Sequence, residues 1–309
     1  LRASDLRGFE IPGVADKVIV SLFADDTTIY LSELDSFDRL VSILDLWCMA
    51  SRAKFNKDKT EAIPMGTAAY RAQLLTTRQL QPDAPLLPAD MRIAADDTGI
   101  RILGAWIGNG LTQMEPWTNT VEKIAAALKR WGRCNPTLRG RRLIAQMIVA
   151  GMTQYLAKVQ GMPAHVEMQI RRITRNFVWK DANASPVGMD TLFLPIRDGG
   201  IKLVDIQTRN EAIELTWLKS YLDLSDSRPI WAFVADVLIT ESVMAVDRNT
   251  VANARVNPYL QSWHVSTHAT SPLPEELKTM LKVARKYDAN FTAIKLSDSM
   301  KRRLPVWYH

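Results

Sequence analysis

The chain has 309 residues, of which 47% are hydrophobic and 23% are charged. This ordinary globular mixture excludes collagen, a wholly disordered chain and a disulfide scaffold, and the length predicts two domains, or one domain with a helical extension. The formal net charge is +6, and so mild a basic balance excludes no class of partner.

Cysteine content and hydropathy indicate in which cellular compartment the protein is expected. Its two cysteines, Cys48 and Cys134, fit a reducing intracellular compartment, exclude a cysteine-rich zinc site and predict two buried thiols. The longest apolar run, 18–24, is far shorter than the ~20 residues that span a bilayer, so we expect no membrane partner. The start lacks both methionine and a signal peptide, and we expect a processed product or fragment of an intracellular, nuclear protein.

The first third of the chain predicts short strands and one helix. Residues 17–31 read as two strands around a tight turn, and the apolar stretch 18–23 predicts a strand covered on both faces. Residues 35–54 predict a helix, and residues 55–66 a turn and a strand. The proline-containing stretch 67–90 predicts a loop, and 91–107 a second hairpin that turns at 97–99.

The remainder predicts a mainly helical region. The pattern is helical from 112 to about 180, with interruptions at 132–136 and 161–163. A hairpin is expected at 198–200, between strands 192–196 and 201–204, followed by helices at 207–224 and 229–245. The predicted fold class is therefore α+β, with the strands concentrated near the N-terminus.

Positive charge is concentrated in residues 121–180. This segment holds twelve basic and two acidic residues, so its formal charge is +10 and the other 249 residues carry −4. Asn135 and Pro136 read as an N-cap and first residue of a helix, which puts Arg139, Arg141 and Arg142 in its first turns, against the helix dipole. A phosphate backbone would relieve both arginines and dipole. The pattern favours a nucleic-acid-binding surface over a merely solvated helix face.

The tetrapeptide Ala-Asp-Asp-Thr occurs twice, at 24–27 and at 95–98. Gly99 follows the second copy, so Asp96 and Asp97 predict a simple turn. The first copy lies between β-prone segments, where Asp25 and Asp26 would repel each other unless a cation were bound. Mg²⁺ is commonly held by one or two carboxylates together with substrate phosphates. The alternatives for the first copy are a Mg²⁺ site and a plain bend.

The string FADDTTIYL at 23–31 resembles the catalytic palm motif of reverse transcriptases, most closely those of non-LTR (LINE-type) retroelements. Other segments resemble further family motifs in the same order: 8–13 (GFEIPG), 56–60 (NKDKT), 102–106 (ILGAW), 138–142 (LRGRR), 177–180 (FVWK), 194–195 (LP) and 199–203 (GGIKL). The resemblance extends over about residues 8–220.

This resemblance implies a partial polymerase palm of β-hairpins and a helix at 1–66, a linker at 67–90, a primer-grip-like hairpin at 91–111, a basic helical thumb at 112–163 and an extension at 164–309. It implies catalytic and metal-binding roles for Asp25 and Asp26, with Mg²⁺ as cofactor, and a place for Lys59 near the leaving pyrophosphate, unless Lys59 is an ordinary surface lysine. The residues expected to contact the RNA template and DNA primer are Leu103, Gly104, Lys129, Arg130, Arg133, Arg139, Arg141 and Arg142. Trp106 and Trp131 are expected in the core, with base stacking as the alternative.

The family pattern also requires a third carboxylate on an earlier strand. The acidic residues before Asp25 are Asp5, Glu10 and Asp16, and none of them lies in a segment that predicts such a strand. We therefore expect that the chain is the C-terminal part of a reverse transcriptase and that it is inactive alone. We also expect it to expose an apolar edge of its sheet and to have the missing fingers and palm as a partner. The alternatives are a catalytically dead nucleic-acid-binding palm–thumb module and a plain helical structural protein.

We expect surface or structural roles for His264 and His268, and a solvated cluster at 301–303.

Overall fold

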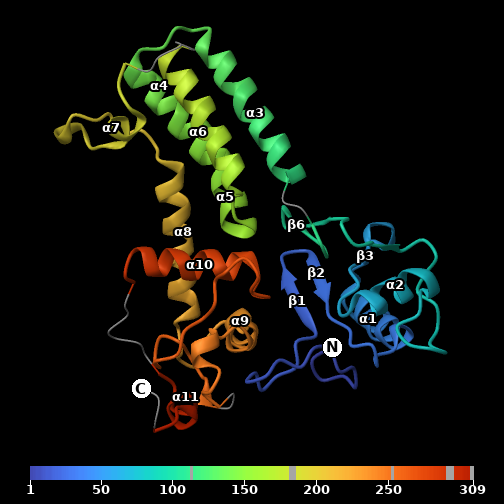
Figure 1. Cartoon of the computed structure of the whole chain (residues 1–309). Helices are drawn as coiled ribbons and strands as arrows, with labels where there is room; N and C mark the ends of the chain where they lie inside the picture. Colours follow the sequence, from blue (N-terminus) through green and yellow to red (C-terminus); the bar gives the residue numbers. More distant parts are fainter. Residues whose placement is uncertain (112–113, 181–185, 252–253, 290–295, 307–309) are drawn as a thin grey trace. The chain divides into compact units, whose positions relative to one another are not determined.

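The computed structural model describes residues 1–111, 114–180, 186–251, 254–289 and 296–306. The chain divides into two compact units, Leu1–Thr112 and Gln113–His309. The described residues of the first unit form three two-stranded sheets and two α-helices, and the second unit is helical over most of its described length (Figure 1). The predicted α+β class is confirmed. No helix in the described ranges is both long and apolar enough to cross a membrane.

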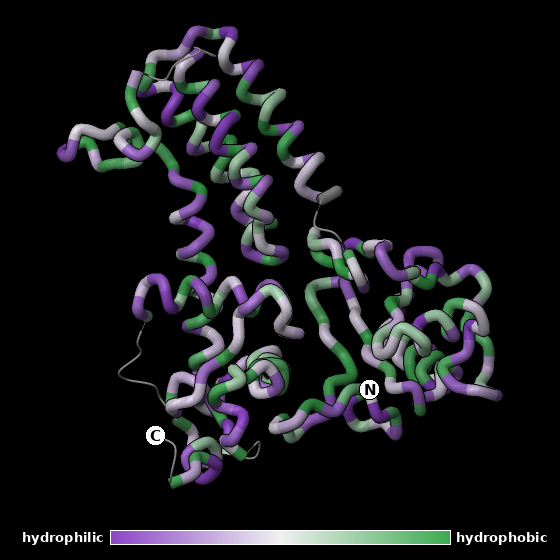
Figure 2. The backbone as a smooth tube through the Cα atoms, in the orientation of Figure 1, coloured by the Kyte–Doolittle hydropathy of each residue, from purple (hydrophilic) through white to green (hydrophobic). Residues whose placement is uncertain are grey.

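The predicted N-terminal hairpin is present in the first unit. Strand β1 (Val20–Phe23) pairs antiparallel with β2 (Asp26–Ile29), and the last pair, Phe23 with Asp26, leaves a two-residue loop. The prediction that 18–23 is covered on both faces is wrong, because Leu22 and Phe23 are 68% and 65% exposed. The small core of Leu6, Ile19 and Leu40 packs at the base of the hairpin, and the hydrophobic colour continues along β1 beyond it (Figure 2).

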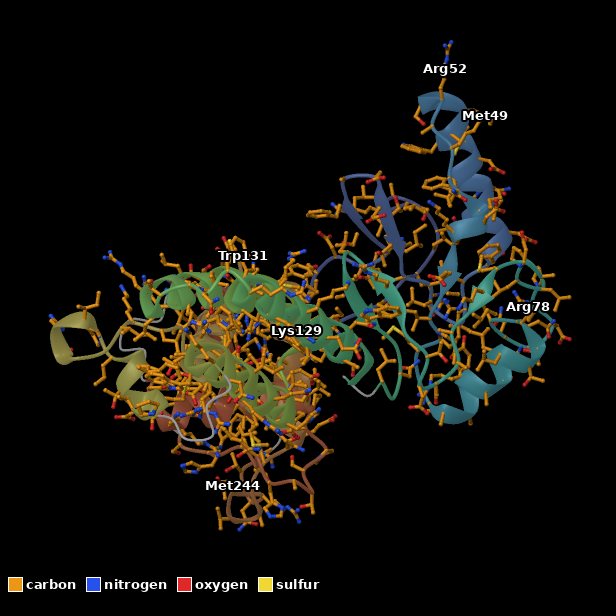
Figure 3. The ribbon with its side chains drawn as sticks, turned by 90° about the horizontal axis from the view of Figure 1, so that it is seen from above. Met49, Arg52, Arg78, Lys129, Trp131 and Met244 are labelled. Atoms are coloured by element: carbon orange, nitrogen blue, oxygen red, sulfur yellow. The ribbon has the colours of Figure 1, made fainter. Side chains whose placement is uncertain are left out.

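Helix α1 (Phe37–Ser51) confirms the helix predicted at 35–54. The Ser36 side chain caps its start by accepting from the Arg39 amide, and Arg52, with a φ of 59°, ends it in the left-handed region. Just before the helix, the buried Asp35 carboxylate accepts from the amides of Arg7 and Gly8 at 2.6 and 2.9 Å. These bonds fasten the N-terminal segment to the start of α1. The free end of the helix is marked by the labelled Met49 and Arg52 in Figure 3.

The prediction of a loop throughout 67–90 is wrong. Helix α2 (Ala68–Thr77) occupies its first half, capped by the Thr67 side chain and ended by Arg78 in the left-handed region. The prolines of this stretch all follow the helix, at 82, 85 and 88. They therefore exclude a helix only from the second half.

The segment 91–107 does not form one hairpin. Strand β4 (Arg92–Ile93) pairs in parallel with β3 (Glu61–Ala62), which follows the 3₁₀ turn η1 (Lys57–Lys59). The hairpin consists of β5 (Ile100–Ile102) and β6 (Ala105–Ile107). It turns at Leu103 and Gly104, so the turn expected at 97–99 is a separate one that precedes the hairpin.

The second unit begins with a helical bundle: α3 (Met114–Gly132), α4 (Leu138–Ala145), the π-helical segment η2 (Gln146–Ala150), α5 (Gly151–Gln160) and α6 (Ala164–Trp179). Trp117, Ile124, Val149 and Ile170 are fully buried in its core. Both predicted helix interruptions are confirmed.

The hairpin predicted around 198–200 is wrong. Helix α7 (Met189–Phe193) and the 3₁₀ turn η3 (Ile196–Asp198) replace the first strand. The chain then folds back on α7, where the Leu192 carbonyl accepts from the amides of Ile201 and Leu203. Gly200 permits this close approach, because a Cβ there would lie 2.1 Å from the Leu194 carbonyl oxygen.

Helix α8 (Ile206–Tyr221) connects the bundle with a second core. That core is formed with α9 (Ile230–Glu241) and α10 (Glu275–Lys286), and α10 lies across α8 (Figure 1). The 3₁₀ turn η4 (Ala245–Asp247) and helix α11 (Asp298–Arg303) complete the described elements. The helices predicted at 207–224 and 229–245 are confirmed, whereas α10 and α11 were not predicted.

Candidate functional site

The tip of the β1–β2 hairpin carries Asp25 and Asp26. Ala24 and Asp25 form its two-residue loop, with Ala24 at a φ of 53°, and Asp26 begins β2. Both aspartates are exposed. In the described part of the chain neither carboxylate pairs with a lysine or arginine. The hairpin therefore presents two adjacent, uncompensated carboxylates to solvent.

The donor set of this tip suits a hard divalent cation. Mg²⁺ takes oxygen ligands, retains waters, and needs one or two carboxylates when a phosphate supplies the rest. Among the described residues there is no group of three or more His, Cys, Asp or Glu side chains that could hold a metal. Asp25 and Asp26 are thus a pair of adjacent oxygen donors, and no third candidate ligand is grouped with them in the described residues.

The second Ala-Asp-Asp-Thr copy has a different environment. The Asp96 carboxylate accepts two hydrogen bonds from the Arg71 guanidinium, at 2.8 and 2.7 Å, and this pairing lowers the pKa of Asp96. Asp97 adopts a φ of 63° and donates its amide to the Asn109 carbonyl at 2.8 Å. The turn predicted for this copy is confirmed, and its first carboxylate already has a cation.

Lys59 and the Leu103–Gly104 pair lie on other elements of the same unit. Lys59 is exposed at the end of η1, where its amide donates to the Asn56 side chain at 3.3 Å. Leu103 and Gly104 form the β5–β6 loop with φ values of 50° and 86°. Two positive φ values are typical of a type I′ turn, which favours asparagine or glycine. For leucine the left-handed conformation costs about 1–2 kcal/mol, and strain of this kind is concentrated at functional sites.

Four predicted nucleic-acid contacts gather at one end of the bundle. Lys129 and Arg130 lie in the last turn of α3, Arg133 in the loop to α4 and Arg139 in the first turn of α4, and all four are exposed. Figure 3 labels Lys129 and the neighbouring Trp131 on α3. The sequence has no acidic residue between Lys123 and Val166, and within the described ranges none of the four pairs with a carboxylate. We call these four side chains the basic end.

Arg141 does not belong to this surface, which corrects its predicted phosphate contact. The residue is 4% exposed. Its guanidinium donates to the carbonyls of Pro136 and Phe177 and lies 5.2 Å from the Phe177 ring centroid. Arg141 therefore fastens the start of α4 to the end of α6.

Arg142 and the helix cap also differ from expectation. Arg142 is half-buried and donates from Nε to the Lys202 carbonyl at 3.1 Å. The N-cap of α4 is Thr137, whose hydroxyl accepts from the Gly140 amide at 3.2 Å. Asn135, the predicted cap, lies before the helix with a φ of 47°. The helix thus begins at Leu138 and not at Pro136.

Several smaller predictions are settled by exposure and contacts. Cys48 is half-buried and Cys134 is exposed, so the prediction of two buried thiols is wrong. Trp106 and Trp131 are each 39% exposed, so neither is a core residue. His264 contacts Asp247 at 3.0 Å and His268 contacts Thr270 at 2.9 Å, which agrees with their predicted surface or structural roles.

Sequence reasoning missed one arginine cluster. Arg171, Arg172 and Arg175 lie on α6 and, together with Gly188 and Met189, line a surface pocket of about 380 Å³. These arginines contributed to the +10 segment but were not singled out. Their i, i+1 and i+4 spacing on a predicted helix was the available signal.

Comparison with known proteins gives one informative match. The chain is 23% identical over 224 residues to the "Transposon TX1 uncharacterized 149 kDa protein" of Xenopus laevis. The alignment covers 71% of this chain and 16% of that protein, so the chain spans about a sixth of its length. No protein-family model matches the chain. The similarity supports a transposon-derived origin.

Proposed function

We propose that the chain is part of a retroelement reverse transcriptase, an RNA-directed DNA polymerase. The observation that carries the proposal is the two-residue hairpin that exposes Asp25 and Asp26 without a cationic partner in the described part of the chain. The similarity to a transposon protein and the ordered motifs of the sequence support it.

In this proposal the first unit supplies the chemistry. Asp25 and Asp26 would hold Mg²⁺, and the ion would supply charge neutralisation for phosphates in nucleotidyl transfer. Leu103 and Gly104 position the primer end through the tight β5–β6 turn, where glycine permits close approach of a backbone. Lys59 neutralises charge on the departing pyrophosphate, as a positioned ammonium can.

The second unit supplies the grip on the template–primer. The basic end carries four exposed cations without carboxylate partners in the described residues, and Arg142 lies on the following turns of α4. Each phosphate that a lysine or arginine neutralises releases counterions, so affinity depends on salt. About five such contacts give a slope of log affinity against log salt near −4 to −5.

The test is binding of the 309-residue chain to an RNA–DNA primer–template at several salt concentrations. Lys129→Ala and Arg130→Ala should each make the slope shallower by about one. Lys301→Ala on α11 is the matched control and should leave the slope unchanged, since Lys301 pairs with Asp298 in another part of the unit. An affinity that did not change with salt concentration would favour the remaining alternative, a plain helical structural protein.

A catalytically dead palm–thumb module is the second candidate function. It is favoured by the finding that no described group of three potential ligands joins Asp25 and Asp26, whereas polymerase chemistry uses paired metals. Mg²⁺-dependent primer extension distinguishes the two. We expect none from the 309-residue chain alone, and we expect extension by a longer protein that contains it to be abolished by Asp25→Ala. Extension unaffected by Asp25→Ala would contradict the metal-binding role.

A further inference from the structure

The arginine-lined pocket on α6 shares no lining residue with the basic end. It is bounded by Met168, Arg171, Arg172, Arg175, Gly188 and Met189 and measures about 380 Å³. Figure 1 shows α7, whose first residue is Met189, on the side of the bundle away from α3. The three arginines and two methionines combine cationic donors with apolar surface, and none of the described residues that line the pocket is acidic.

The charges facing this pocket are only partly compensated. Arg171 pairs with Asp190 at 2.6 Å and lies 5.5 Å from the Phe193 ring centroid. Arg175 donates to the neutral Asn176 side chain at 3.0 and 3.3 Å. In the described ranges neither Arg172 nor Arg175 pairs with a carboxylate, and both are exposed. Like charges four residues apart on a helix repel, so a bound anion would stabilise this face.

A smaller cavity adjoins the pocket. It measures about 90 Å³ and shares Met168, Arg171 and Met189 with the outer pocket. Thr174 lines it, is 3% exposed, and has a hydroxyl without a hydrogen-bond partner among the described residues. Buried hydroxyls are normally paired, so this oxygen is available to a group that enters from the outer pocket. Glu167 and Asp205 also line the inner cavity, which places the anion in the outer one.

We propose that this pocket binds single-stranded nucleic acid. Arg172 and Arg175 contact phosphates, because guanidinium donors match phosphate oxygens in geometry and charge. An unstacked base packs on Met168, which is 66% exposed and lines the pocket together with the buried Met189. A duplex hides its base faces, whereas a single strand offers them for packing. The inference extends the proposed function to a second surface, and it can fail while that function stands.

The experiment measures binding of a labelled single-stranded RNA of about ten nucleotides to the 309-residue chain by fluorescence anisotropy. The double variant Arg172→Glu/Arg175→Glu should raise Kd by roughly tenfold or more and make the salt slope shallower by about one to two. Met168→Ala should weaken binding severalfold with an unchanged salt slope. Arg302→Glu, an exposed arginine on α11, gives the matched control and should leave Kd within about twofold. The milder pair Arg172→Ala/Arg175→Ala replaces the charge reversal if that variant does not fold.

Four outcomes would overturn the proposal. An unchanged Kd in both folded arginine variants excludes the pocket. Displacement of the RNA by inorganic phosphate at matched ionic strength shows a site for an isolated ion. If single-stranded RNA does not bind but the primer–template does, with its salt slope reduced by Lys129→Ala, this inference fails alone. If neither nucleic acid binds, the proposed function fails with it.

Discussion

The two Ala-Asp-Asp-Thr segments of the first unit have the same four residues in different surroundings. In the first, Asp25 lies in a hairpin loop and Asp26 opens β2, and both are exposed without a described cationic partner. In the second, Asp96 accepts hydrogen bonds from two of the three nitrogens of the Arg71 guanidinium, which we call the arginine fork. Two arginines of the second unit also have different surroundings. Arg139 is exposed, whereas Arg141, two residues later, is buried and bonds to the Phe177 carbonyl.

The difference shows that partners far away in sequence decide what a short acidic motif can do. Arg71 lies 25 residues before Asp96 on α2 and neutralises it within the fold. Asp25 and Asp26 are exposed and have no such arginine among the described residues, so their oxygens stay open to an added ligand. The first copy therefore has two unpaired carboxylates, whereas the first carboxylate of the second copy is already paired.

Cation binding gives the largest expected contrast between the two copies. Mn²⁺, a paramagnetic substitute for Mg²⁺, should broaden the amide NMR signals of residues 24–27 and leave those of 95–98 sharp. Asp25→Asn should weaken this binding roughly tenfold, because a loss of about 1.4 kcal/mol corresponds to that factor. Asp97→Asn is the matched control and should have no effect at the first copy. Equal broadening at both copies would refute the metal-binding reading of the hairpin tip.

Removal of the arginine fork should make the second copy resemble the first. In Arg71→Met the pairing with Asp96 is lost together with the bond from Arg71 to the Gly66 carbonyl. We expect a lower melting temperature of the first unit and new, weak broadening of the Asp96 amide by Mn²⁺. Arg52→Met, at the exposed end of α1, controls for the change of net charge. An unchanged melting temperature would show that the fork contributes nothing to stability.

The fork also predicts a pH dependence with a definite sign. The hydrogen bonds from Arg71 lower the pKa of Asp96 below its ordinary 3.8. The stabilisation is therefore complete above the unfolded-state pKa and is lost as pH falls through the lowered folded-state value. The stability difference between wild type and Arg71→Met should be constant from neutral pH to about pH 5 and shrink below pH 4. A difference that grew on acidification would contradict the pairing.

Local sequence patterns predicted the parts of the structure that are determined by residues close to one another in the sequence. The first hairpin and the bundle helices with their glycine–proline breaks follow from periodicity and turn residues. The pattern does not predict helix α2, because the three prolines that follow the helix indicate a loop for the whole stretch 67–90. The burial of Arg141 depends on Phe177, 36 residues away. Because such partners are set by tertiary packing, the sequence pattern could identify the basic residues but not say which of them reach solvent.

The backbone of the two copies supplies the smallest expected effect. Ala24 and Asp97 both have positive φ, 53° and 63°, but aspartate tolerates the left-handed region better than alanine does. Ala24→Gly removes a cost of about 1–2 kcal/mol and adds a backbone entropy penalty of about 0.5–1 kcal/mol. The hairpin should thus gain between about 0 and 1.5 kcal/mol, measured as slower hydrogen exchange of the β1–β2 amides. Asp97→Gly should bring no gain, because aspartate already accommodates this conformation. If Ala24→Gly also left Mn²⁺ affinity unchanged, the strain at Ala24 would belong to the turn alone and not to presentation of the carboxylates.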